Sequence, residues 1–255
     1  MRKFSRAQVA EEYSRIKSGG GDFFSNYCFP PDGADMDGVS SGESLLLFKP
    51  ERDFVRLFFI TRSLDNLGSL LDSSLPDGFC ACVEIASRGA PARDLDDLFK
   101  SRFRLHSVYE KMELARIPPA VAAEARGELA PEELSADMDA VFDKFSDHIP
   151  EISEISRFCS EKRAVSFPSQ AGPSYVLFSI EGAFAYINFF ANRAGRAGME
   201  RLWSGFYSAA ALAGARAARL WVNRRNEKAL AVYSREGFKG GGIFSTAYVR
   251  SPDGG

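Results

Sequence analysis

Long apolar runs, histidine and paired cysteines are scarce in this chain of 255 residues. No apolar stretch approaches the ~20 residues that a membrane-spanning helix needs, so we expect no membrane partner. The N-terminal stretch has basic residues but lacks the apolar segment of a secretory signal. The four cysteines form no C-x-x-C pair and no zinc-like cluster with His106 or His148, so we expect no metal. These absences favour reduced cysteines in a cytoplasmic protein.

The chain also lacks a large excess of positive or negative charge. The formal net charge is −2, which gives no reason to expect nucleic acid as a partner. Hydrophobic residues make up 45% and charged residues 26%, as in ordinary globular proteins. Phenylalanine, with 22 copies, is the abundant residue, and most copies should lie in a core. The length suits two modest domains or one large one.

A break near the middle of the chain predicts two domains. Pro118 and Pro119 can continue neither a helix nor a central strand, and the alanine-rich stretch after them has no core pattern. We place the boundary near residue 125, which gives an N-terminal α/β domain over 1–125 and a second domain over 126–255.

Apolar periodicity predicts alternating helices and strands in both halves. In the first half we expect helices over 6–17, 64–74 and 94–103, and strands over 44–49, 54–61, 79–86 and 107–115. In the second half we expect helices over 131–146, 152–162, 198–213 and 227–236, and strands over 164–167, 174–180, 183–189, 218–223 and 243–250. The glycine runs at 19–21 and 240–242 are interpreted as turns or linkers.

This alternation favours an α/β (α+β) fold with a mixed central sheet flanked by helices. Both halves contain a strand–helix–strand–helix succession. A duplicated fold and ordinary α/β alternation both explain it, and the sequence leaves the two open.

The turn after strand 183–189 has features of an anion site. Gly195 and Gly198 precede an amphipathic helix, whose free N–H groups and positive dipole end favour a phosphate. Arg193 and Arg196 add cations on the same turn. A plain strand-to-helix turn with solvated arginines explains the turn equally well when it is taken alone.

The stretch "LWVNRRNEKALAVYSREGF" (220–238) adds a second signal. Asn226 and Tyr233 are seven residues apart, so the spacing predicts that they share one helix face. With the turn, this stretch resembles the GCN5-related N-acetyltransferases (GNATs), whose C-terminal motif is present here in register as Leu220, Val222, Asn226, Ala229, Tyr233, Gly237 and Phe238. The resemblance covers about residues 128–250. The segment "DHIPEISEI" (147–155) also resembles a stretch in some bacterial two-domain members.

The resemblance implies a GNAT-like fold and acetyl-CoA as cosubstrate. It also admits a tandem arrangement in which the N-terminal half is a degenerate GNAT-like copy. It implies that the pyrophosphate lies on the backbone of Arg193, Ala194, Gly195, Arg196, Ala197, Gly198 and Met199. The pantetheine arm would lie along Asn188, Phe189, Phe190 and Ala191. Asn226 would contact the pantetheine or a water, and the Tyr233 hydroxyl would face the sulfur. The loop departs from the family pattern at Arg196, where glycine is expected.

The chemistry supports Tyr233 as the acid that protonates the departing thiolate. The general base stays open, because strand 183–189 offers only Asn188 as a strongly polar side chain. His148 is a candidate base, although a loop histidine is more often a surface residue.

The function that follows is transfer of an acetyl group from acetyl-CoA to a primary amine by direct attack in a ternary complex. The alternative is a non-catalytic GNAT-like protein with a degenerate CoA loop that acts in binding or assembly. Asp65 adds negative charge at the start of helix 64–74, so we expect no second donor site and one CoA per chain. The acceptor, a small-molecule or peptide amine, and the presence of a homodimer stay open.

Overall fold

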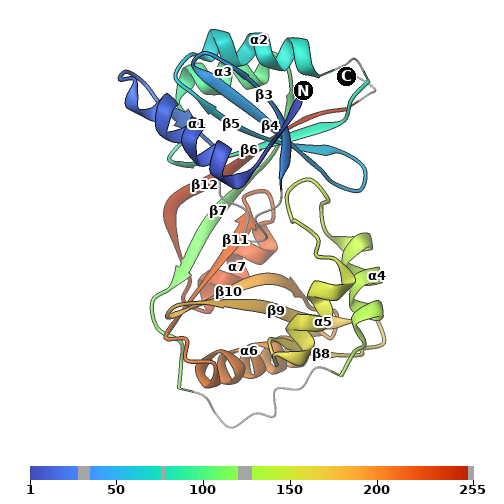
Figure 1. The fold of residues 1–255 in the computed structure, drawn as a ribbon. Coiled ribbons are helices and arrows are strands. Elements are labelled where there is room, and N and C mark those ends of the chain that lie inside the picture. The colour runs from blue at the N-terminus through green and yellow to red at the C-terminus, as the bar shows by residue number, and fades with distance from the viewer. Residues whose placement is uncertain (28–34, 76–77, 120–127, 252–255) are drawn as a thin grey trace. The chain divides into compact units, whose positions relative to one another are not determined.

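The computed structural model describes residues 1–27, 35–75, 78–119 and 128–251 (Figure 1). The chain divides into two compact units. Unit 1 comprises Met1–Val108 and Phe244–Gly255, and unit 2 comprises Tyr109–Ile243. The boundary predicted near residue 125 lies outside the described residues and stays a prediction. Among the described helices, none has both the length and the apolar character to span a membrane.

Unit 1 is built on a mixed sheet flanked by helices. Its strands follow the order β1-β3-β4-β5-β6, with the end of β12 beside β6. The strands are β1 (Arg2–Phe4), β2 (Phe24–Ser25), β3 (Met36–Ser41), β4 (Ser44–Pro50), β5 (Val55–Thr61) and β6 (Ala81–Arg88). The helices are α1 (Arg6–Ser18), α2 (Leu64–Ser74) and α3 (Arg93–Lys100).

Alternation along the strands gives unit 1 two apolar faces. On β4, Leu46 and Phe48 join the core cluster of α2 and α3, whereas Leu45 and Leu47 join the cluster of α1. Local signals start the helices. Ser5 and Gln8 form a capping box at α1, in which Ser5 N–H donates to Gln8 Oε1 at 2.8 Å.

Unit 2 repeats this plan. Its strands follow the order β12-β7-β11-β10-β9-β8, with the start of β12 and the end of β7 in this unit. The strands are β7 (Arg104–Leu114), β8 (Ala164–Phe167), β9 (Ser174–Glu181), β10 (Phe184–Ala191), β11 (Ala217–Asn223) and β12 (Lys239–Arg250). The helices are α4 (Pro131–Val141), α5 (Ile152–Ser160), α6 (Gly195–Leu212) and α7 (Glu227–Arg235).

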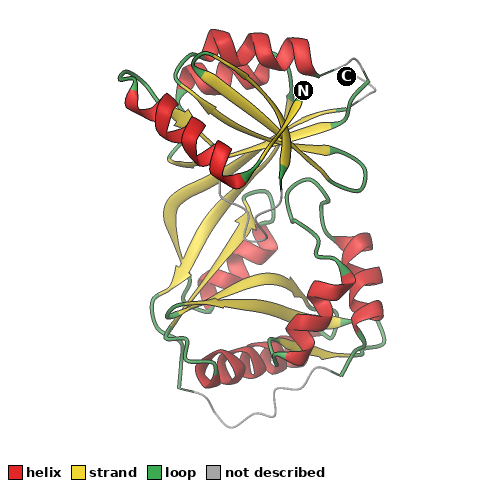
Figure 2. Cartoon of the chain, in the orientation of Figure 1, coloured by secondary structure: helices red, strands yellow, loops and turns green. Residues whose placement is uncertain are grey.

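Helices cover both faces of the unit 2 sheet, as Figure 2 shows. Val176 and Phe178 on β9 belong to the cluster that contains the buried residues of α6 and Tyr233 of α7. Tyr175 and Leu177, on the opposite face of the same strand, pack with α4 and α5. The sheet therefore holds the start of α6 and the end of β10 in fixed positions next to each other.

The predicted alternation of helices and strands is confirmed, and α2 and β8 have the predicted bounds. Several predicted bounds and interpretations need correction, and three strands were missed. The helix predicted over 131–146 ends at Val141, and α6 begins three residues before the predicted 198. Residues 240–242 lie inside β12 instead of a turn, because the neighbouring strand supplies ladder partners for a glycine run. Strands β1, β2 and β3 were not predicted, because they are short or polar.

Candidate active site

Strands β10 and β11 separate in the middle of unit 2. They pair in parallel from Phe184–Ala217 to Ile187–Leu220 and no further. Beyond Ile187 the register of β10 on β9 shifts at Asn188, which is a β-bulge and is exposed. Among the described residues, no hydrogen bond joins the two strands past this point. The edge of β10 over 189–191 therefore faces a gap in the ladder, which we call the unit 2 splay.

Helix α6 starts next to the end of β10 without a cap. Its N-cap residue is Ala194, no side chain caps it, and no acidic residue lies in its first turn. Gly198 N–H reaches Ala194 O at 3.4 Å, whereas the N–H groups of Gly195, Arg196 and Ala197 have no acceptor among the described residues. Three unsatisfied donors at a positive dipole end favour an anion at this position.

Glycine and asparagine shape this turn. Gly195 has φ of +66°, a conformation that glycine adopts without steric cost. A Cβ on Gly198 would lie 2.4 Å from Ala194 Cβ and 2.8 Å from Asn192 Oδ1. Asn192 Nδ2 donates to Gly195 O at 2.8 Å, and its Oδ1 accepts from Ala194 N at 3.2 Å. Asn192 was not predicted as a site residue, although it holds the turn in place.

The two arginines of the turn point to different partners. Arg193 pairs with Asp137 on α4, and its backbone N–H donates to Ser174 Oγ at 2.9 Å. Its charge is therefore neutralised within the protein, which corrects the expectation of a free cation. Arg196 is 94% exposed and pairs with Glu200 at 3.1 Å along the helix surface. Its side chain does not cover the open N–H groups.

The residues predicted along the pantetheine arm face alternate sides of β10. Phe189 and Ala191 are buried against α4 and α5. Phe190 lies on the other face, 4.9 Å from the ring of Trp203 and 6.2 Å from that of Tyr233. Met199 packs at the margin of that same core. Because these side chains are packed, residues 189–191 offer mainly their backbone along the splay.

Tyr233 lies in the aromatic cluster under the splay. It is 8% exposed, and its ring contacts Phe190, Trp203 and Phe238. Its hydroxyl has no hydrogen-bond partner among the described residues. The buried Trp203 Nε1 in the same cluster has none either. Burial, and then the charge of Asp147, raise the pKa of Tyr233, so the phenol stays protonated at neutral pH. A buried phenol without a partner is suited to donate to a ligand.

Asn226 is the N-cap of α7, which corrects the prediction that it shares a helix face with Tyr233. Its Oδ1 accepts from Ala229 N at 3.0 Å, and the residue is exposed. A strong local reason, helix capping, therefore explains this asparagine.

The connection between α4 and α5 supplies a carboxylate that was not predicted. Asp147 Oδ1 accepts from the Tyr109 hydroxyl at 2.7 Å, and Asp147 Oδ2 accepts from Asp143 N at 2.7 Å. His148, the predicted candidate base, is exposed and has φ of +47°. With the left-handed backbone at His148, the Asp147 carboxylate lies toward the interior of unit 2 and the His148 imidazole lies on the surface. The only sequence signal was that Asp147 precedes the histidine in the same loop.

Unit 1 contains the same parallel pair of strands with its gap filled. β5 and β6 pair from Val55–Ala81 to Leu57–Val83. Where they separate, Asn26 Nδ2 donates to Leu57 O and to Glu84 O, both at 3.0 Å. Phe59 N donates to Asn26 Oδ1 at 2.6 Å. The chain's own residues therefore occupy, in unit 1, the edge that stays open in unit 2.

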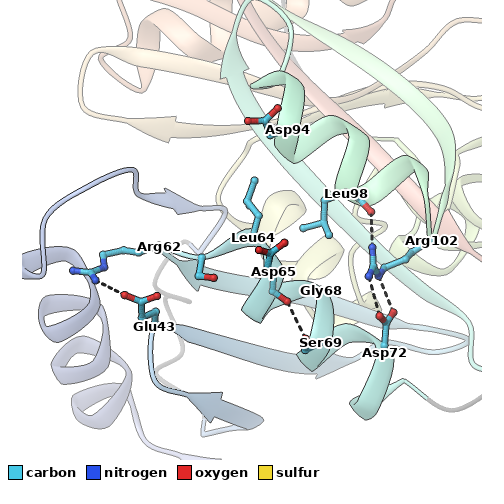
Figure 3. A pocket seen from close by; sticks show the side chains of 11 residues that line it. Glu43, Arg62, Leu64, Asp65, Gly68, Ser69, Asp72, Asp94, Leu98 and Arg102 are labelled. Atoms are coloured by element: carbon cyan, nitrogen blue, oxygen red, sulfur yellow. Dashed lines mark hydrogen bonds and ion pairs between the residues drawn. The ribbon is translucent and has the colours of Figure 1, made fainter.

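The helix start beside this filled gap is also satisfied. Ser63 caps α2 by accepting from Asn66 N at 3.2 Å, and Asp65 lies in the first turn. An open pocket of about 830 Å³ adjoins this helix start (Figure 3). The charged residues that line it are four carboxylates and two arginines: Glu43, Asp65, Asp72, Asp94, Arg62 and Arg102. Arg62 pairs with Glu43, and Arg102 pairs with Asp72. This excess of negative charge disfavours an anion at α2.

Comparisons with known proteins show the fold. The chain matches a GCN5-related N-acetyltransferase from Sphaerobacter thermophilus with a TM-score of 0.57 and 14% identity, over 95% of this chain and 85% of the other. It matches a GNAT-family acetyltransferase from Colwellia psychrerythraea with a TM-score of 0.56 and 9% identity, over 98% and 99%. No family model and no curated protein matches the sequence.

A third structure bears on the repeated plan. It is described as a tandem GNAT protein from the clavulanic acid biosynthesis pathway, and it matches with a TM-score of 0.52 and 12% identity over 98% of both chains. The chain therefore has the GNAT fold, in a mixed α+β architecture, and matches a tandem GNAT structure along nearly its whole length. This confirms the fold that the resemblance implied.

We expect Asn26→Ala to lower the free energy of unfolding by about 1–3 kcal/mol, because it leaves buried backbone groups of β5 and β6 without partners. Urea denaturation measures the loss. Asn66→Ala is the matched control, because the Asn66 side chain makes no hydrogen bond within the described ranges; it should change stability by about 0.5 kcal/mol or less. Equal effects of the two substitutions would show that Asn26 does not hold the gap closed.

Proposed function

We propose that this chain is an N-acetyltransferase that moves the acetyl group of acetyl-CoA to a primary amine, with the donor site in unit 2. The observation that carries the proposal is the open splay of β10 and β11 beside the uncapped start of α6. The GNAT fold adds support, since the matched proteins from Sphaerobacter thermophilus and Colwellia psychrerythraea are named acetyltransferases.

In this proposal the pyrophosphate of acetyl-CoA lies on the N–H groups of Gly195, Arg196 and Ala197. These donors have no acceptor among the described residues, so the ligand displaces only water. The amide groups of the pantetheine arm continue the ladder along the 189–191 edge of β10, as a β-strand would. Arg196 can turn its exposed side chain toward the phosphates.

The chemistry needs two donors at the splay. An amine attacks the thioester carbonyl, and the oxyanion is stabilised by a backbone N–H group on the open edge of β10. Tyr233, protonated and without a hydrogen-bond partner among the described residues, donates its proton to the CoA thiolate as it leaves. Asn226 acts mainly as the cap that orients α7, and hence Tyr233.

The alternative, a non-catalytic GNAT-like protein, was motivated by Arg196 in the phosphate turn. An arginine there would block the turn only if its side chain covered the amide groups, and it extends to Glu200 instead. We therefore retain the enzymatic proposal. A cytoplasmic location and an acceptor that is a small molecule or a peptide belong to the same proposal.

Calorimetry with acetyl-CoA tests the donor site. We expect one acetyl-CoA per chain, because the gap of unit 1 is filled by Asn26. Gly198→Ala should weaken binding about ten-fold or more, since its Cβ would collide with Ala194 and distort the turn. Leu212→Ala, at an 86% exposed position of the same helix, is the control and should bind normally. No binding at millimolar acetyl-CoA, or two molecules per chain, would contradict the proposal.

Kinetics of Tyr233→Phe test the acid, once a substrate screen has supplied an acceptor. We expect kcat to fall about 10²-fold while the affinity for acetyl-CoA changes little, because only the proton donor is lost. Tyr207→Phe is the matched control: Tyr207 stacks on Trp203 in the same cluster and donates to Glu236 at 3.1 Å. Wild-type turnover in Tyr233→Phe would mean that Tyr233 is a packing residue and that the thiolate leaves unassisted.

A further inference from the structure

Asp147 of unit 2 has a carboxylate that is held in place by two hydrogen bonds and can accept more. Its two oxygens accept one hydrogen bond each, from the Tyr109 hydroxyl and from the backbone of Asp143. A carboxylate offers about four lone-pair positions, so two acceptor positions remain. The side chain is half-buried, which means that solvent or a ligand still reaches it.

Its neighbours place Asp147 at the splay. Tyr109, which holds it, is paired across the ladder with Asn223, the last residue of β11 and beyond the point where β10 and β11 separate. Within the same unit, burial first and then the negative charge of Asp147 raise the pKa of Tyr233 on α7. Asp147 is therefore near the place where the thioester lies in the proposed function.

We infer that Asp147 binds the ammonium group of the acceptor and is the general base that removes its proton. This inference rests on the proposed function, and it fills the role for which strand β10 offers no side chain. The acceptor class that follows is an amine that is protonated at neutral pH, since an ammonium group matches the charge of a carboxylate.

The protons balance in three steps. Asp147 takes one proton from the ammonium group and later releases it to water. The amine nitrogen then bonds to the thioester carbon, and as the tetrahedral intermediate collapses, the C–S electron pair leaves with sulfur, which takes the Tyr233 proton. The second proton on nitrogen returns to the Tyr233 oxygen, so the products are the amide, CoA thiol and one proton in solution.

The surroundings of Asp147 raise its pKa on balance, which suits a general base. Burial raises its pKa above the usual range, and the charge of Asp143 acts in the same direction. The hydrogen bond from Tyr109 on β7, the Asp143 backbone N–H and the charge of His148 lower it. Tyr233 on α7, whose pKa the charge of Asp147 raises, stays neutral. A carboxyl with a raised pKa is a stronger base than an exposed one.

Two small nucleophiles test the inference without the natural acceptor. Ethylamine is an ammonium ion at neutral pH and must lose a proton, whereas hydroxylamine is largely unprotonated and needs no such step. With acetyl-CoA and each probe, Asp147→Asn should lose about 10²-fold in kcat/KM for ethylamine and little for hydroxylamine. Its affinity for acetyl-CoA, measured by calorimetry, should be unchanged. Asp139→Asn, an exposed change on α4, is the matched control.

A second variant guards against misfolding of the first. Tyr109→Phe keeps the ring and the carboxylate but removes a hydrogen bond that lowers the pKa of Asp147. The acidic limb of the ethylamine pH profile should therefore move to higher pH, while the hydroxylamine profile stays in place. Equal losses with both probes, an unmoved limb, or a wild-type protein that binds acetyl-CoA yet transfers to neither probe would overturn the inference. Absence of acetyl-CoA binding would instead refute the proposed function.

Discussion

The separation of two parallel strands is the constraint on which the rest of the structure depends. In each unit a pair of neighbouring strands forms a short parallel ladder and then diverges, which leaves backbone N–H and C=O groups that need partners. Unit 1 satisfies them with its own Asn26, which bridges β5 and β6. Unit 2 has no such filler among the described residues. The same local geometry therefore gives a closed structural unit in one case and a candidate ligand site in the other.

The starts of the two helices beside these gaps differ in the same way as the gaps: the start of α2 is satisfied by the chain itself, and the start of α6 is open. At α2, Ser63 and Asp65 supply a cap and a negative charge, so the dipole end is already compensated. At α6, Ala194 offers no cap, and Arg193 is committed to Asp137, which leaves the backbone as the source of positive potential. Both the gap and the helix start thus favour an anionic ligand in unit 2 rather than in unit 1, by two observations that do not depend on each other.

The sequence predicted what local patterns encode. Periodicity placed α2 and β8, and the motif from Asn226 to Phe238 led to the correct fold. It did not predict the role of Asn26, because the partners of this side chain are more than 30 residues away on strands that must first form. Asp147 was overlooked in favour of His148, since only the left-handed backbone decides which of the two faces inward. The capping role of Asn226 was readable from its position before a helix.

The central claim is that the open amides at the start of α6 receive the pyrophosphate of acetyl-CoA. Hydrogen exchange measured by mass spectrometry, with and without acetyl-CoA, tests it most directly, because it reports on the backbone N–H groups of short segments over minutes to hours. The account predicts slower exchange over 193–199 and along 188–191 when the ligand is present, with no change over 63–67 at the start of α2. Protection at α2, or unchanged exchange at α6 when acetyl-CoA is bound, would contradict it.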